Sequence, residues 1–188
     1  MSIYTLDSET ALSAGGVADG DLFLVADASV DYAAKTITMD VLRSSMSAIV
    51  ATTATALSIT KALHANRTVV INSAAPIAIT LPQAIGSGDR YRFVVGVAAT
   101  GTAHTIAVAN ATDNMNGGLA IFDTSATDIT ALAFAATATD DRISLDGTTK
   151  AGTVGTIVEI EDVKTGLFAV SVRGAATGSY ATPFSAAV

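Results

Sequence analysis

The sequence predicts a mainly β protein, with a β-sandwich or jelly-roll-like domain preceded by an N-terminal arm that contains one short helix. Val and Thr are abundant, and their β-branched side chains pack well on a pleated sheet. Short apolar segments alternate with Gly, Asn and Asp turns, a pattern typical of sandwiches and barrels. The clearest alternation runs over Arg90–Val97, where Tyr91, Phe93 and Val95 share the face expected to be buried.

Length and composition limit the possible classes of protein. The 188 residues suit one domain with an arm, and the absence of Cys excludes disulfides and thiolate catalysis. A net charge of −7 disfavours contact with phosphate backbones, so we expect no nucleic-acid partner. Charged residues make up only 14% of the chain, whereas about a quarter is usual. A surface with so few charges indicates assembly with other subunits.

The mean hydropathy of +0.51 raises the question of a membrane protein. No run approaches the ~20 apolar residues that a spanning helix needs, so we expect no membrane partner. The first residues carry no basic region followed by a long apolar core, and we therefore expect no secretion signal.

Residues 1–60 are expected to form the N-terminal arm. The first twenty are rich in Ser, Ala and Gly, and a short apolar strand is predicted over Asp21–Asp27. That strand either edges the main core or docks on a neighbouring subunit. The docking interpretation makes four residues candidates for partner contact. They are Leu22, Phe23, Leu24 and Val25.

Lys35–Val50 is interpreted as a strand that leads into a helix, with Thr38 as its N-cap. Four apolar residues would line one helical face. They are Met39, Leu42, Met46 and Ile49. Such a face either lies on its own domain or meets symmetry mates at a trimer axis. Ala51–Thr60 has no clear period and is expected to be a linker or the frayed end of the helix.

Residues 61–188 are expected to form the β domain. The predicted strands are Arg67–Asn72, Ile77–Leu81, Arg90–Val97, His104–Ala109, Leu119–Phe122, Ala131–Phe134, Arg142–Leu145, Thr153–Glu161 and Leu167–Arg173. The last two should form a hairpin closed by Val163–Gly166, with Ile160 opposite Phe168. This pairing places Glu159 and Glu161 on the solvent side.

Residues with chemical potential are few. His64 and His104 have no motif around them, and His104 is expected at the surface or bonded to its own turn. Glu159 and Glu161 are interpreted as a solvated strand face, since a catalytic pair of carboxylates would have to converge in a pocket.

Two loops invite comparison with binding motifs. The loop from Asn110 to Asn116 fails the EF-hand spacing and is expected to be a turn held by its own side chains. Gly86-Ser87-Gly88 lacks the Gly-Lys-Ser/Thr ending of a phosphate loop. We therefore expect no enzyme, no cofactor and no metal.

Several segments together resemble tailed-bacteriophage virion proteins. They are Leu81-Pro82, Gly86-Ser87-Gly88, Tyr91–Gly96, His104–Asp113, Asn116-Gly117 and Ile143–Thr148. The resemblance covers about the C-terminal two thirds of the chain. It is to capsid decoration (cement) proteins, head fibres and tail-fibre modules, which are commonly homotrimers of β-rich domains.

The resemblance implies a homotrimeric decoration protein on the capsid surface of the virion, with the major capsid protein as its partner. The alternative is a head-fibre or tail-fibre module that binds a host receptor or glycan. A glycan-active enzyme is a third possibility. Aromatic residues make up only 5% of the chain, and those of the central strand lie on its core face. This weighs against both glycan hypotheses.

Overall fold

A computed structural model describes residues 22–27, 33–38, 49–124, 131–177 and 180–186. The chain divides into two compact units, Met1–Ser47 and Ala48–Val188. Each is described by itself below.

The described part of the first unit is a hairpin. Strand β1 (Leu22–Asp27) pairs antiparallel with β2 (Ala33–Thr38), with Leu24 opposite Thr36. These strands agree with the predicted strand at Asp21–Asp27 and with the start of the segment expected to be strand then helix. The expected helix extends to Val50, and residues 39–48 of it lie outside the described residues. Its end is wrong, because Ile49 is not helical and Val50 begins a strand.

The second unit begins before the boundary expected between residues 60 and 61. Within the tract expected to be a linker, β3 (Val50–Thr52) pairs parallel with β5 (Arg67–Asn72), and β4 (Ala56–Ser58) pairs parallel with β6 (Ala78–Thr80). Short Ala- and Thr-rich segments are poor strands alone, and here the ladder bonds of an existing sheet edge hold them. A single helical turn, α2 (Lys61–His64), follows where only strands were expected.

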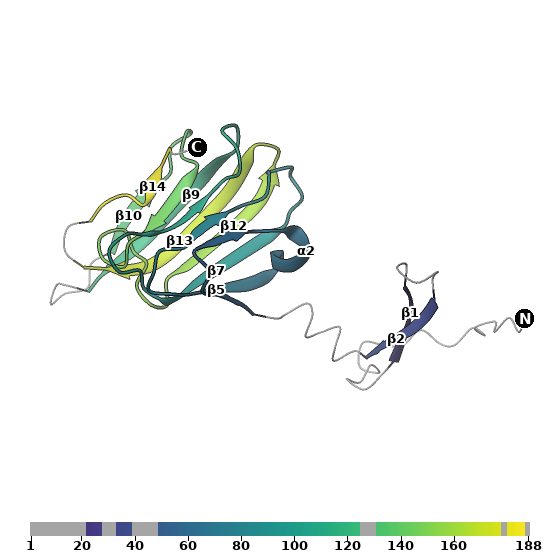
Figure 1. Cartoon of the computed structure of the whole chain (residues 1–188). Coiled ribbons are helices and arrows are strands. Elements are labelled where there is room, and N and C mark those ends of the chain that lie inside the picture. The colour runs from purple at the N-terminus through teal and green to yellow at the C-terminus, as the bar shows by residue number, and fades with distance from the viewer. Residues whose placement is uncertain (1–21, 28–32, 39–48, 125–130, 178–179, 187–188) are drawn as a thin grey trace, which may run out of the picture. The chain divides into compact units, whose positions relative to one another are not determined.

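The second unit is a β-sandwich, so the predicted mainly β two-sheet fold is confirmed (Figure 1). One sheet has seven strands in the order β10-β9-β13-β12-β7-β5-β3, and the other has five in the order β14-β11-β8-β6-β4. The remaining strands are β7 (Arg90–Val97), β8 (His104–Ala107), β9 (Asn114–Asp123), β10 (Ala131–Ala135), β11 (Arg142–Leu145), β12 (Ile157–Lys164), β13 (Leu167–Ala176) and β14 (Phe184–Ser185).

From β3 to β8 the chain crosses between the sheets at every strand. As a result β3, β5 and β7 run parallel in one sheet, and β4, β6 and β8 run parallel in the other. Parallel neighbours cannot be joined by a tight turn, and here the crossover passes through the opposite sheet. The later strands β11, β12 and β13 complete the sheets mainly by antiparallel pairing.

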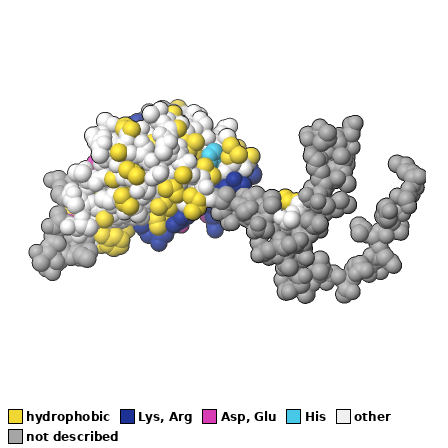
Figure 2. Space-filling view, turned by 60° about the horizontal axis from the view of Figure 1, so that its bottom comes forward, with side chains coloured by type: hydrophobic (Ala, Val, Ile, Leu, Met, Phe, Trp, Pro, Cys, Tyr) yellow, Lys and Arg dark blue, Asp and Glu magenta, His cyan; other side chains and the backbone are white. Residues whose placement is uncertain are grey.

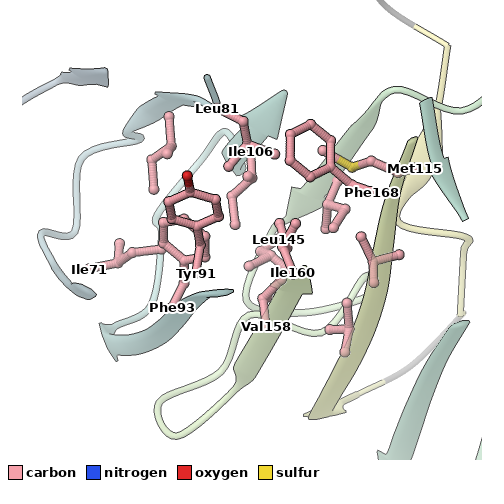
Figure 3. Packing of buried hydrophobic residues seen from close by; sticks show 14 of the residues in the cluster. Ile71, Leu81, Tyr91, Phe93, Ile106, Met115, Leu145, Val158, Ile160 and Phe168 are labelled. Carbon is pink, nitrogen blue, oxygen red and sulfur yellow. The ribbon is translucent and has the colours of Figure 1, made fainter. Parts of the chain in front are cut away.

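The core lies between the inner faces of the two sheets (Figure 3). Tyr91, Phe93 and Val95 of β7 are buried, as the alternation predicted. They meet Ile106 of β8 and Leu145 of β11 from the other sheet. Few of these residues are aromatic, and the core is built largely from Ile, Leu and Val, as the composition indicated.

The β12–β13 hairpin has the predicted faces but not the predicted register. Ile160 pairs with Val170, and Phe168 pairs with Asp162. The expected pairing of Ile160 with Phe168 is therefore wrong by two residues. A shift of two leaves every side chain on the same face, so the alternation could not distinguish the two registers. A bulge between Asp162 and Lys164 lengthens the first strand, and Gly166 turns with a φ of 79°.

Candidate interaction surface

The outer face of the seven-stranded sheet carries a ladder of charged side chains. Antiparallel pairing of β7 with β12 places Arg90 opposite Glu161 and Arg92 opposite Glu159. Arg90 Nε lies 2.9 Å from Glu161 Oε2, and Arg92 Nε lies 3.8 Å from Glu159 Oε1. Arg173 on β13 also approaches Glu159, at 3.2 Å. Because these groups are exposed, each pair contributes little to stability, about 0–1 kcal/mol.

A groove of about 520 Å³ lies over this ladder. Arg67 and Arg92 stand on one side of it, Glu159 and Glu161 line its middle, and Ser171 belongs to its far side. Ala169 and Ser171 are small, which leaves the face hollow there. The groove offers guanidinium donors and carboxylate acceptors to a polar surface. Its tyrosine cannot stack on a sugar, because Tyr91 is only 2% exposed and lies in the core.

A second hollow, of about 590 Å³, continues across the same sheet over β9, β10 and β13. Its outward residues on β9 and β10 are small: Gly118, Ala120, Ala133 and Ala135. On β13 it is lined by Ser171 and by Arg173, which pairs with Ala120. Phe122 is the next outward residue of β9 after Ala120. It pairs with Ala131 of β10 and is 48% exposed. The outer face of this sheet therefore carries mostly small side chains over β9 and β10, and charged side chains over β7 and β12.

An apolar row also crosses this outer face. Val94 of β7 pairs with Val70 of β5 on one side and with Ile157 of β12 on the other. All three are half-buried although they point away from the core. A solvated sheet face is expected to be polar, so this row is unusual.

The five-stranded sheet has a different outer face. Its outward positions hold only Ala, Ser, Thr and one Arg. They are Ala56, Ser58, Ala78, Thr80, Thr105, Ala107, Arg142, Ser144 and Ser185. Large apolar side chains thus point outward from only one of the two sheets in the described strands.

Few acidic side chains are visible on the face of the described residues drawn in Figure 2, despite the acidic composition. On the face drawn in Figure 2, Lys and Arg side chains are more visible than those of Asp and Glu. Most of the described aspartates of the sandwich are buried. They are Asp89, Asp113, Asp123, Asp140, Asp141 and Asp162. The net charge of the chain therefore says little about the charge of a particular face.

A second polar cluster holds the loop Gly86-Ser87-Gly88. Asp162 accepts hydrogen bonds from the backbone amides of Ile85 at 3.2 Å, Gly86 at 2.7 Å and Ser87 at 3.0 Å. The Ser87 hydroxyl lies 2.8 Å from Asp162 and 2.7 Å from Asp89, and shares its one proton between them. Lys61 Nζ lies 3.0 Å from Asp89.

The hydrogen bonds of this cluster stabilise its two carboxylates in the ionised form. Burial alone would raise the pKa of Asp162, but hydrogen bonds from Ser87, Gly86 and Ile85 outweigh it and lower that pKa. The Ser87 hydrogen bond and the Lys61 ammonium likewise lower the pKa of Asp89 against the effect of burial. Carboxylates with lowered pKa values are weak bases, which makes them poorly suited to deprotonate the Ser87 hydroxyl.

Asp162 is the residue that the sequence analysis most misjudged. It directly follows Glu159 and Glu161, which the sequence places on the solvent side. In the structure Glu159 and Glu161 do point outward, whereas Asp162 is buried. The alternation of β12 supplies the missing signal, since Asp162 continues the inward row of Val158 and Ile160.

The two histidines are both buried, so a solvent-exposed position for His104 is wrong. Its bond to Val97 does span the connection that precedes it, between β7 and β8. His104 Nδ1 accepts a hydrogen bond from the Ile77 amide at 3.1 Å, and its Nε2 lies 3.2 Å from the Val97 carbonyl. The ring is therefore the neutral tautomer with the proton on Nε2. Burial lowers the pKa of His104, and the Val97 carbonyl offsets this in part. The ring of His104 therefore links Ile77, just before β6, to Val97 at the end of β7.

The loop at Asn110 forms the expected side-chain turn. Asn110 Oδ1 accepts hydrogen bonds from the amides of Thr112 and Asp113, both at 2.9 Å. Asp113 in turn accepts from the Ala84 amide at 2.8 Å. Across the described ranges, no group of three or more His, Cys, Asp and Glu side chains is arranged to hold a metal ion.

Comparisons with known proteins do not assign this chain to a family. Neither protein-family models, nor curated proteins, nor solved structures yield a match to this chain. None of the helices in the described segments has the length and apolar character to cross a membrane.

The predicted partner-contact residues are only partly placed. Leu22, Phe23, Leu24 and Val25 form most of β1, but their side chains lie outside the described part. Met39, Leu42 and Met46 lie outside the described residues altogether. Ile49 immediately precedes β3 and is 68% exposed.

The outer face was partly visible in the sequence. Alternation placed Arg90, Arg92, Glu159 and Glu161 on outward positions. Their pairing was not predictable, because β7 and β12 are about 60 residues apart in the chain. The matching Arg-x-Arg and Glu-x-Glu spacing is the one local signal that could have suggested it.

Proposed function

We propose that the protein is a structural component of a tailed-bacteriophage virion: a homotrimeric capsid decoration protein that binds the outside of the head and stabilises it. The proposal extends the family resemblance described above. In it, the sandwich is the body of each subunit and the N-terminal unit makes the contact with the major capsid protein.

The separate N-terminal hairpin is the observation that supports this most strongly. Among the described strands, β1 and β2 pair only with each other. An isolated two-stranded hairpin is at best marginally stable in water. Residues Leu22–Val25 are consecutive apolar residues in it. A segment of this kind is best stabilised by a partner surface.

The proposed mechanism is stabilisation by linked binding. A protein that binds only the closed capsid adds a free energy that must be lost before the shell opens. This mechanism requires affinity and geometry and no chemical step.

Co-sedimentation with capsids that lack this protein tests the proposal. The full chain should pellet with the capsids and raise the temperature at which they release their contents. Deleting Met1–Gly20 should weaken binding, and deleting Met1–Ser47 should abolish it. Circular dichroism should show that both deletions keep the β signal.

Three results would each contradict a part of the proposal. Failure of the full chain to bind any capsid would remove the decoration function. Antibody labelling of tail tips rather than heads in electron micrographs would instead support the fibre alternative. Undiminished binding by the chain without Met1–Ser47 would move the attachment site to the sandwich.

A further inference from the structure

We propose that His104 is an acid-sensitive contact that holds the β4–β6 edge of the five-stranded sheet in place, and that protonation of its ring releases this edge. Strands β6 and β4 are the last two of that sheet and lie beyond β8, which begins with His104. The property belongs to the sandwich itself and does not depend on the partner that the protein binds.

The ring of His104 joins backbone groups from the two sheets. It is fully buried, its Nδ1 accepts the Ile77 amide at 3.1 Å, and its Nε2 donates to the Val97 carbonyl at 3.2 Å. Ile77 directly precedes β6 in the five-stranded sheet, and Val97 ends β7 in the seven-stranded sheet. The contact with Ile77 exists only while Nδ1 carries no proton, because an amide can only donate.

A proton on Nδ1 turns the Ile77 contact from attractive to repulsive. A charged histidine carries N–H groups on both ring nitrogens, so the new Nδ1–H would face the Ile77 amide, donor against donor. Ile77 is itself buried, and its amide would be left without an acceptor, which is costly. The Nε2 contact with Val97 is unaffected, so the strain falls on the β6 side of the ring.

The described strands around His104 bring no carboxylate to the ring that could stabilise its charged form. β6 and β8 contain no other titratable residue, and Arg142 of β11 lies opposite Ala107 at the far end of β8. The titratable residues of β5 and β7 lie at the starts of these strands, whereas the ring contacts the end of β7, and those of β12 lie alongside the same starts. They are Arg67, Arg90, Tyr91 and Arg92, with Glu159, Glu161, Asp162 and Lys164 on β12.

The carboxylate of Asp146 is the one that the neighbouring loop supplies, and that loop already uses it. Asp146 follows Leu145, the residue of β11 that pairs with His104. Its oxygens accept three hydrogen bonds, of 2.6–2.9 Å, from the amides of Thr148 and Lys150 and the hydroxyl of Thr149. Burial accordingly lowers the pKa of His104, and the Val97 carbonyl offsets this only in part.

The β4–β6 edge is held by few hydrogen bonds. Each of the two strands has three residues. The Ile77 carbonyl accepts the Thr105 amide at 2.9 Å, and the Ala78 amide donates to the Thr55 carbonyl at 2.9 Å, so the pairing of β6 with both neighbours begins beside the His104 contact. Short elements with few bonds open locally at a lower free energy than the whole domain. Loss of the Ile77 contact is therefore expected to open this edge first.

The pH range of the effect is set by the exposed histidine of the open form. An exposed histidine titrates near pH 6.5, and the ring in the closed edge binds a proton less readily. The open form therefore takes up the proton first as the pH falls, and the edge becomes less stable below about pH 6.5. Between pH 7.5 and pH 5.5 the open fraction should rise about tenfold, while ordinary carboxylates stay mostly ionised.

Amide hydrogen exchange of the full chain, corrected for the intrinsic effect of pH on exchange, tests this inference. In the wild type, protection over residues 56–59 and 77–81 should fall about tenfold between pH 7.5 and pH 5.5, and protection over β12 and β13 should not change. His104→Asn places an amide oxygen near the Nδ1 position and cannot titrate, so it should abolish the response. His64→Asn removes the other buried histidine, which accepts the Thr60 amide from within α2, and should keep the response.

An NMR titration of the His104 ring in the folded wild type gives an answer even if His104→Asn does not fold. A ring that titrates at or above pH 6.5 would overturn the inference. So would unchanged protection of the β4–β6 edge at pH 5.5, or an equal loss over all strands. A response that persists in His104→Asn, or that disappears in His64→Asn, would show that another group is responsible.

Discussion

Replacing Asp162 by Asn tests the idea that one buried carboxylate holds the Gly86–Gly88 loop against the sheet. Its Oδ1 accepts the Gly86 amide, and its Oδ2 accepts the amides of Ile85 and Ser87 and the Ser87 hydroxyl. An asparagine can keep only one oxygen. The favoured orientation keeps the oxygen at the Oδ2 position, so the new NH₂ group faces the Gly86 amide, donor against donor.

The magnitude follows from these contacts. Losing one hydrogen bond to a charged group costs about 1.5–3 kcal/mol. The three remaining bonds lose the contribution of the charge, which roughly halves their strength. We therefore expect Asp162→Asn to lower the free energy of unfolding by roughly 3–5 kcal/mol. That is a large part of the ~5–15 kcal/mol typical of a native protein.

Urea unfolding at pH 7 measures this loss directly. Glu159→Gln is the matched control, since it neutralises an exposed carboxylate on the same strand and should change stability by about 0.5 kcal/mol or less. A loss below about 1 kcal/mol in Asp162→Asn would refute the reasoning. It would show that water or a shifted loop satisfies the three amides equally well.

The pH dependence gives an independent check. The pKa of Asp162 is lowered in the folded state, while an unfolded Asp titrates near 3.9. The unfolded chain therefore takes up the proton first as the pH falls. The contribution of Asp162 is complete well above pH 4 and is lost as the pH falls through the folded pKa. The stability difference between wild type and Asp162→Asn should shrink below about pH 4.

Two further substitutions test the core and the pairing of the sheets. Phe93→Ala should cost about 3–5 kcal/mol in urea unfolding, because Phe93 is fully buried and its removal leaves a cavity; a loss no greater than that of Glu159→Gln would show that β7 does not face the core. Gly117→Ala should cost more than about 2 kcal/mol by thermal unfolding, because its φ is 148° and an added Cβ would lie 1.8 Å from the Val170 carbonyl oxygen. Gly101→Ala is the control for the second change, since its φ is also positive but its surroundings are open. Equal losses in the two glycine variants would mean that backbone strain, not the close approach of β13, sets the cost.

Side-chain alternation predicted much of the sandwich. The bounds of β5, β7 and β11 agree with the predicted segments, because each is a short apolar run between turn residues. The inward position of Phe93 and the outward position of Glu159 also follow from alternation. A period of two is a local property, and the sequence displays it directly.

The alternation of side chains could not predict which strands pair when they are far apart in the chain. Turn signals favour antiparallel neighbours in the chain, whereas β3, β5 and β7 pair in parallel after passing through the other sheet. No local pattern specifies which distant strand is the partner. The short strands β3 and β4 were missed for a related reason, since sheet-edge hydrogen bonds rather than their own residues define them.

The polar residues show the same limit. The burial of His104 depends on the Ile77 amide and the Val97 carbonyl, which lie on other segments and are not visible around His104 in the sequence. The outward arginines of β7 could be assigned to a face, but their glutamate partners on β12 could not. The ion pairs between β7 and β12 can be identified only from the register in which these strands pair.

The order of strands in the larger sheet has a consequence for synthesis on the ribosome. The β12–β13 hairpin sits between β7 and β9, although it comes near the end of the chain. Until it emerges, both of these strands present open edges, which are templates for pairing with other chains. About 60 residues separate β7 from β12, or roughly 3–12 s of translation at ~5–20 residues per second. Nascent chains on crowded ribosomes are therefore most prone to aggregate in this interval, and premature termination before Ile157 would make that state permanent.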